Sequence, residues 1–232
     1  MKKSMGNFFS PGLVLFPIAF LLAGLLLFLR AKEAAALSLD EITARTQRVY
    51  EKTTDMKANF TQEATIKSMG RTEREEGIFY FKNPRRMAWD YTKPKTKKLV
   101  INHQTAWFYI PEDGVVYIQD AEGVFKSRLG IRFLSGLGKL QEDFSIAFAV
   151  PEHVDREGNY LLKFAPREAD FGIGELFVAI DKETFHISRL IFTDTYGNIT
   201  RLSFRNIKFN NKLPDHIFSF SPPPGVDVYN TR

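Results

Sequence analysis

The sequence predicts a mainly β fold with a few helices: an unclosed antiparallel β-barrel, or curved half-barrel sheet, with a helical lid. Short segments of alternating apolar or aromatic residues recur along the chain, and Pro and Gly separate them. Evenly spaced short strands of this kind are typical of an antiparallel barrel or a strongly curved sheet. Only two short segments have helical spacing. They are too few to cover a large sheet in the α/β manner, but enough to cover one concave face.

The first predicted helix runs from about Leu39 to Thr53. Ser38 and Glu41 match a capping box at its start. Leu39, Ile42, Thr46 and Val49 follow at helical spacing, which predicts an amphipathic helix. A second, short helix is expected over residues 131–140, where Gly136 and Gly138 interrupt an apolar run.

Period-two alternation begins at Met56, where Met56, Ala58 and Phe60 share one face of a predicted strand. A turn is expected at Lys67–Gly70. The predicted strands that follow are 75–82, 86–92, 97–102, 105–110, 115–120, 143–148, 159–165, 174–181, 186–194 and 198–209.

The segment around the corner at Pro84 is apolar on both faces. Phe79 and Phe81 share one face of the first strand, while Ile78 and Tyr80 share the other. A strand that buries a single face normally alternates apolar with polar residues. This strand therefore needs a second apolar partner, which is either a helix or an apolar ligand.

Residues 1–36 have the pattern of a Sec signal peptide: two lysines, the uncharged apolar run 13–29 and a small-residue site at 34–36. We expect cleavage after Ala36. The alternative is an uncleaved membrane anchor, because the apolar run is long enough to span a bilayer. Residues 37–232 then form one domain outside the cytosol.

The composition argues against an enzyme. The chain has no Cys, which excludes disulfides, thiolate nucleophiles and Cys-ligated zinc. None of its four His lies at metal-ligand spacing with another, and neither a nucleophile elbow nor a phosphate loop occurs. Much of the formal net charge of +5 comes from residues 1–36, so it does not indicate nucleic-acid binding. We expect no catalytic residues, no metal and no cofactor.

Aromatic residues are abundant instead, with 22 Phe, 8 Tyr and 2 Trp. They could form an ordinary barrel core, because a small closed barrel fills its interior with its own side chains. The extra apolar helices favour an open half-barrel with a lipid-sized cavity. The predicted cavity wall comprises Phe60, Phe79, Phe81, Met87, Trp89 and Trp107. The predicted lid comprises Leu39, Ile42, Val49, Phe133, Leu134 and Leu137.

Four stretches, at 60–62, 77–91, 105–111 and 218–226, occur in an order and spacing that is fairly specific. Together they resemble the periplasmic outer-membrane lipoprotein carrier family, LolA, from about Leu39 to Val228. The resemblance implies an unclosed barrel with a helical lid, a periplasmic location and no cofactor. It also implies a monomer that takes acylated lipoproteins from an inner-membrane ABC transporter to an outer-membrane acceptor, where one exists.

The chain departs from this family pattern at one position. Members commonly have Arg immediately before the corner proline, where it holds the lid, and here that residue is Asn83. Asn83 can bond to a lid carbonyl but lacks the charge and reach of Arg. The expected lid latch is therefore Asn83 with Arg85, which could supply the missing group. The alternative is that Arg85 and Arg86 are simply solvated.

Two other functions share these features. One is a membrane-tethered or periplasmic sensor that binds acyl chains or lipoproteins without carrying them, which an uncleaved anchor would favour. The other is a carrier of a different lipid class. The sequence does not separate these cargoes.

Overall fold

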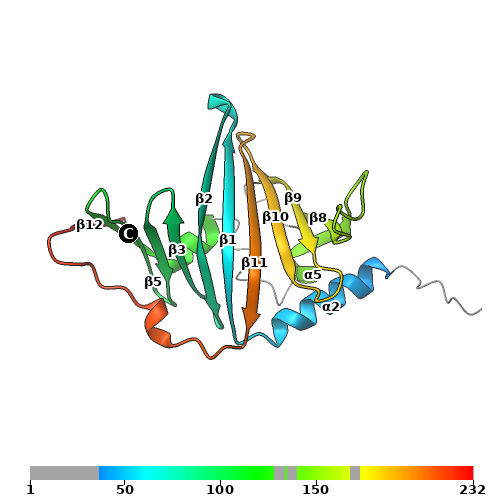
Figure 1. The fold of residues 1–232 in the computed structure, drawn as a ribbon, viewed down its shortest axis with the longest axis horizontal. Coiled ribbons are helices and arrows are strands. Elements are labelled where there is room, and N and C mark those ends of the chain that lie inside the picture. Colours follow the sequence, from blue (N-terminus) through cyan, green and yellow to red (C-terminus); the bar gives the residue numbers. More distant parts are fainter. Residues whose placement is uncertain (1–36, 128–133, 135–139, 168–172, 232) are drawn as a thin grey trace, which may run out of the picture. The chain divides into compact units, whose positions relative to one another are not determined.

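A single sheet dominates the computed structural model, which describes residues 37–127, 134, 140–167 and 173–231. In this part of the chain, twelve strands follow the order β12-β6-β5-β4-β3-β2-β1-β11-β10-β9-β8-β7 (Figure 1). The strands are β1 (Asp55–Ile66), β2 (Arg71–Lys82), β3 (Arg86–Lys93), β4 (Lys97–Ile101), β5 (Thr105–Ile110), β6 (Val115–Asp120), β7 (Phe144–Phe148), β8 (Tyr160–Pro166), β9 (Ile173–Ile180), β10 (Ile187–Asp194), β11 (Ile199–Phe209) and β12 (Asp227–Asn230).

The sheet is open and curved, as the sequence predicts. Its two ends in the strand order, β12 and β7, are edges, and all pairings are antiparallel except that of β12 with β6. The predicted strand ranges agree with the structure to within a few residues, and the main difference is that β2 begins earlier, at Arg71. The parallel edge strand β12 was not predicted. The predicted signal peptide, residues 1–36, lies outside the described residues.

The first helix, α2 (Leu39–Glu51), begins as the capping box predicts. The side chain of Ser38 accepts a hydrogen bond of 3.2 Å from the backbone nitrogen of Glu41. Acidic residues in the first turn favour the helix because they oppose its dipole. The buried side of α2 consists of Ile42, Thr43, Thr46 and Tyr50.

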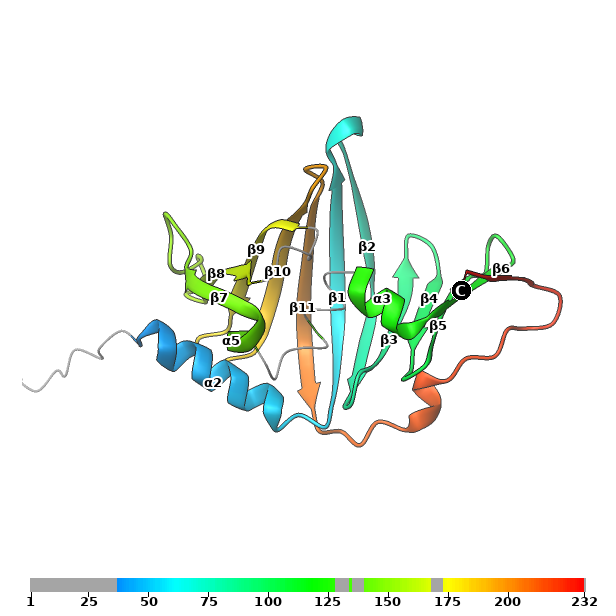
Figure 2. The ribbon, with the colours of Figure 1, turned by 180° about the vertical axis from the view of Figure 1, so that it is seen from behind.

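The described part also contains two shorter α-helices, α3 (Ala121–Ser127), which was not predicted, and α5 (Leu140–Asp143), and the 3₁₀ helices Lys67–Met69 and Asp215–Phe218. Most of the second predicted helix, including Phe133 and Leu137, lies outside the described residues. Figure 2 shows α2, α3 and α5 on the same side of the sheet. We call this side the inner face and the opposite side the outer face.

Helix α2 crosses the half of the sheet formed by β7 to β11. The hydroxyl of Tyr50 accepts a 2.9 Å hydrogen bond from the backbone nitrogen of Ile187 in β10. Its ring meets Phe209 in β11 edge-on, with 6.0 Å between centroids. Burial raises the pKa of Tyr50 well above its ordinary value, so the hydroxyl stays neutral. This contact ties the C-terminal end of the helix to the sheet.

The outer face of β2 to β5 is covered by the segment that follows β11. Leu213 and Phe218 pack there on Ala88 and Val100. Nearby, the Asp215 carboxylate accepts hydrogen bonds from Lys82 at 2.6 Å and from Arg86 at 2.9 Å. These bonds, first that of Lys82, hold the pKa of Asp215 below its usual range. The segment then leads the chain to β12.

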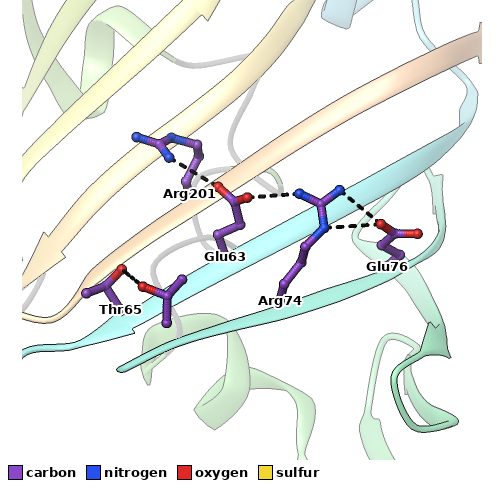
Figure 3. Close-up of polar contacts among 6 residues, drawn as sticks. Glu63, Thr65, Arg74, Glu76 and Arg201 are labelled. Carbon is purple, nitrogen blue, oxygen red and sulfur yellow. Dashed lines mark hydrogen bonds and ion pairs between the residues drawn. The ribbon is translucent and has the colours of Figure 1, made fainter. Parts of the chain in front are cut away.

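A row of charged side chains crosses the outer face higher on the sheet (Figure 3). Glu63 in β1 lies between Arg201 at 3.1 Å and Arg74 at 2.9 Å, and Arg74 also bonds to Glu76. Glu63 is three residues from Phe60 on the same strand, so the two side chains point to opposite faces. Each exposed pair contributes little, but the row fits only one register of β11, β1 and β2.

A glycine in β2 makes room for the inner-face aromatic residues. Gly77 lies opposite Phe60 in β1 and Tyr91 in β3. A Cβ atom at Gly77 would lie 2.1 Å from the carbonyl oxygen of Asp90 and 2.8 Å from Cε1 of Phe60. The Phe60 ring therefore occupies space that any other residue would need.

We expect Gly77→Ala to lower the free energy of unfolding by more than about 2 kcal/mol, because backbone and ring must both shift. Urea unfolding measures the change. Gly123→Ala in α3 is the matched control, since a Cβ there meets nothing within 4 Å. That variant should be neutral or more stable by up to about 1 kcal/mol. Equal midpoints for both variants would contradict this view of Gly77.

Candidate functional site

Five aromatic residues pack together on the inner face at the middle of the sheet. Phe60 meets Trp89 and Tyr91 edge-on, with centroid distances of 4.9 and 5.0 Å. Phe79 lies 4.3 Å from Trp89 and 5.5 Å from Phe204. Contacts of this geometry add to the stabilisation that burial of the rings provides. We call these five residues the aromatic cluster.

Strand register brings most of the predicted cavity wall to this face. Phe79 pairs with Trp89, and Phe81 pairs with Met87, across β2 and β3. Phe60 joins them from β1. None of these five predicted residues is more than 6% exposed. They form one continuous surface, and their role as the wall of a lipid cavity stays a prediction.

The expectation that Trp107 belongs to the same wall is wrong. Trp107 pairs with Val100, which pairs with Ala88, and all three point to the outer face. There Trp107 packs against the cluster around Phe218. The strand 105–110 is apolar on both faces, so alternation alone could not show which aromatic side chain points inward. Its neighbour Phe108, paired with Leu99, is the inward one.

Phe204 was not among the predicted cavity-wall residues. It lies opposite Phe60 in the pairing of β1 with β11, although 144 positions separate the two residues along the chain. Across the inner face, the buried residues continue into the other half of the sheet with Leu202, Leu190, Val178 and Leu162. No local pattern predicts these long-range neighbours, because register depends on the assembled sheet.

A polar rim borders the aromatic cluster on one side. Gln62 donates a 3.3 Å hydrogen bond to Glu75, which also forms an ion pair with Lys97. The Lys97 ammonium lies 4.6 Å from the centroid of the Tyr91 ring. Along β3, the inner face thus changes from apolar at Met87 to polar beyond Tyr91. This gradient matches a ligand with an apolar tail and a polar head.

The predicted lid residues differ in how far their side chains are buried. Ile42 in α2 is 0% exposed and Leu134 is 2% exposed. Leu39 and Val49 are half-buried. Phe133 and Leu137 lie outside the described residues. In α3, Val124 and Phe125 are also buried.

Asn83 of the predicted latch holds the root of α2. Its side-chain amide donates a hydrogen bond to the carbonyl of Thr53, just past the end of the helix. Its backbone nitrogen bonds to the carbonyl of Thr54 at 2.9 Å. From the other side, the side chain of Asn210 accepts a 2.8 Å bond from the Thr54 nitrogen. The junction of α2 and β1 is therefore anchored to the ends of β2 and β11.

Arg85 of the predicted latch contacts a different helix, α3. Its guanidinium pairs with Glu122 at 3.0 Å and lies 4.2 Å from the centroid of the Phe125 ring. The side chain remains 46% exposed, so the ion pair itself is weak. Arg86, in contrast, faces the outer side and pairs with Asp215. The two latch residues thus hold two separate helices, one each.

Two buried polar atoms near the inner face have no hydrogen-bond partner in the described structure: the hydroxyl of Thr46 and the indole nitrogen of Trp89. Thr43 and Thr53 each donate their hydroxyl to a carbonyl four residues earlier, at 2.8 Å. Thr46, on the same helix, makes no such bond. A buried unpaired donor costs about 1–3 kcal/mol, so both atoms weaken the closed arrangement.

We expect Arg85→Ala to loosen α3 without unfolding the protein. Loss of the ion pair and cation–π contact should lower the free energy of unfolding by about 1 kcal/mol or less. Binding of a hydrophobic dye such as ANS should rise severalfold, because Phe125 and the face beneath it become accessible.

The matched control is Arg74→Ala, which removes ion pairs with Glu63 and Glu76 on the outer face, away from α3. It should lose similar stability without a rise in dye binding. Unchanged dye fluorescence in Arg85→Ala would show that Arg85 does not hold the cover.

Neither a candidate metal site nor a membrane-spanning helix is found in the described part of the chain. It contains no group of three or more His, Asp or Glu side chains that could hold a metal ion. None of its helices has both the length and the apolar character needed to cross a bilayer.

The chain is similar to known proteins over most of its length. The model of the family described as "Outer membrane lipoprotein carrier protein LolA" matches residues 51–221. An outer-membrane lipoprotein carrier protein of Methylococcus capsulatus is 31% identical over 185 residues, covering 76% of this chain and 82% of the relative. One of Bordetella avium is 30% identical over 191 residues, covering 82% and 85%.

The fold also occurs in a solved structure, an uncharacterized conserved protein from Thermus thermophilus. It superposes with a TM-score of 0.53 at 17% identity, over 84% of this chain and 99% of that one. This likeness concerns the fold alone. The matching family model and relatives carry the assignment: the chain belongs to the LolA family of outer membrane lipoprotein carrier proteins, which are carriers and not enzymes.

Proposed function

We propose that this protein is a periplasmic carrier that shields the acyl chains of lipoproteins on its inner face and ferries them from the inner to the outer membrane. The observation that carries the proposal is the aromatic cluster, buried except for the half-buried Tyr91, on the side of the sheet where α2, α3 and α5 lie (Figure 2). The names of the relatives from Methylococcus capsulatus and Bordetella avium support lipoproteins as the cargo.

The physical problem of such a carrier is the cost of moving hydrocarbon through water. Each buried methylene is worth about 0.8 kcal/mol, so one long acyl chain resists leaving a membrane by on the order of 10 kcal/mol. The carrier must offset most of this cost and still release the cargo. A cover of the protein's own apolar side chains solves both problems, because it competes with the acyl chains for the same surface.

The closed arrangement described above is then the empty form. Cargo would displace α2 and α3 and take the place of Ile42, Val124 and Phe125 against the sheet. The anchors that must break include the Tyr50 bond to Ile187, the cation–π contact of Arg45 with the Phe185 ring, and the Arg85 contacts with α3. Each has a net value of about 1 kcal/mol, so acyl burial can exceed their sum. The bonds of Asn83 and Asn210 can persist while the helix swings about its root.

An inner-membrane ABC transporter would load the carrier, and an outer-membrane acceptor would unload it. This route requires a freely diffusing protein, so we propose that residues 1–36 are a signal peptide cleaved after Ala36. N-terminal sequencing of the exported protein tests this step. An intact N-terminus would instead favour a tethered sensor, which binds acyl chains without ferrying them.

We expect the mature protein to bind a purified acylated lipoprotein at one-to-one stoichiometry and to keep it in solution without detergent. Size-exclusion chromatography with mass spectrometry measures the complex. The same lipoprotein without its acyl chains is the control and should elute separately. Binding of both forms alike, or of neither, would overturn the proposed function.

We expect Thr46→Val to strengthen the closed form at the expense of cargo binding. The substitution removes an unpaired buried hydroxyl, so the free energy of unfolding should rise by about 1 kcal/mol. Because the cover competes with cargo, lipoprotein affinity should fall by about fivefold.

Thr43→Val is the matched control on the same helix, since the Thr43 hydroxyl is bonded to the Leu39 carbonyl. It should gain no stability and leave affinity unchanged. Tighter lipoprotein binding by Thr46→Val would contradict competition between cover and cargo.

A further inference from the structure

We infer that the indole N–H of Trp89 donates a hydrogen bond to the ester or amide carbonyl of a bound acyl chain. The site would then select acyl esters and amides over hydrocarbons and alkyl ethers of the same length. This inference rests on the proposed function and deepens it, because it names the chemical group that the inner face recognises.

The indole N–H of Trp89 is buried without a hydrogen-bond partner in the described structure. The residue is 4% exposed. Its neighbours are the rings of Phe60, Phe79 and Phe204, which offer no oxygen or nitrogen acceptor. An aromatic face is only a weak acceptor. The indole nitrogen can donate a hydrogen bond but cannot accept one, so only an acceptor atom can satisfy it.

The ring contacts of Trp89 do not need an indole. A Phe side chain at this position could pack edge-on against Phe60 and beside Phe79 without burying a donor. The N–H therefore costs the closed form stability and brings it no contact. Buried unsatisfied groups are rare in native proteins and call for an explanation. An acceptor that enters when the cover opens is such an explanation.

Trp89 lies between the apolar part of the inner face and its polar rim. On the inner face of β3, Met87 precedes it within the buried region and Tyr91 follows it. Tyr91 pairs across the strands with Lys97, which forms the polar rim with Glu75. In an acyl lipid, the carbonyl likewise lies between the hydrocarbon tail and the polar head. A tail seated over Met87 and Phe81 would therefore bring its carbonyl toward Trp89.

The free energy of this hydrogen bond favours an acyl carbonyl over a group that offers no comparable acceptor. A hydrogen bond that satisfies a buried donor adds the ordinary gain of the bond to the removal of an existing penalty. Tail burial alone cannot provide such selectivity, because the hydrophobic contribution is non-directional and depends on area. The expected preference for an ester over the matching ether is about five- to tenfold in the dissociation constant.

The test uses the mature protein with two probes: a short-chain diester glycerophosphocholine and its diether analogue with chains of equal length. Dissociation constants are measured by calorimetry for wild type, Trp89→Phe and Trp107→Phe. Trp107→Phe is the matched control, because it makes the same change on the outer face. It also leaves Trp89 as the one indole of the chain, whose N–H signal can be followed by ¹H–¹⁵N NMR.

Wild type and Trp107→Phe should bind the diester about five- to tenfold more tightly than the diether. Trp89→Phe should bind both probes alike. In Trp107→Phe, the indole N–H signal should move downfield with the diester and less with the diether. This NMR measurement does not depend on the folding of Trp89→Phe.

Equal binding of both probes by wild type, or an ester preference that persists in Trp89→Phe, would overturn the inference and leave the carrier function standing. An indole signal that responds equally to both probes would also overturn it. If wild type bound neither these probes nor an acylated lipoprotein, the proposed function would fail together with the inference.

Discussion

The pairing of β1 with β2 on one side and with β11 on the other is the constraint on which the rest of the structure depends. It sets Phe60 over the bare backbone of Gly77 and opposite Phe204. A slip of β1 by one residue would turn Phe60 to the outer face and away from the rest of the cluster. The row of charges through Glu63 opposes that slip, because its partners on β11 and β2 would no longer meet.

This register creates an apolar surface that is wider than a strand pair can hide, and the helices cover it. The cover is not tightly fixed. Its polar anchors include those at the root of α2, at Tyr50 and at Arg85. The buried side of α2 also carries the unpaired hydroxyl of Thr46. A surface that is strongly apolar and weakly covered can accept another apolar partner. The features that weaken the closed form thus also allow another apolar partner to replace the helices on this surface.

Separate residues hold the two helices α2 and α3. Asn83, immediately before the corner proline, donates from its side-chain amide to the Thr53 carbonyl just past the end of α2. Arg85 follows the corner proline and reaches α3 instead, where it meets Glu122 and Phe125. The short amide is sufficient for the nearby carbonyl, while the long guanidinium spans the greater distance to α3. The two helices can therefore loosen independently.

The sequence by itself determined the class of fold, the capped first helix, nearly all strand ranges and the apolar character of Phe60, Phe79, Phe81, Met87 and Trp89. These features follow from local periodicity, turn residues and caps, which act over a few residues. Only the tertiary structure decided that Trp107 faces outward, that Phe204 joins the cluster, and that Arg85 holds α3. The edge strand β12 likewise forms only against β6. The physical reason is that strand register and facing depend on contacts between residues far apart along the chain, and a strand that is apolar on both sides carries no local sign of which side is buried.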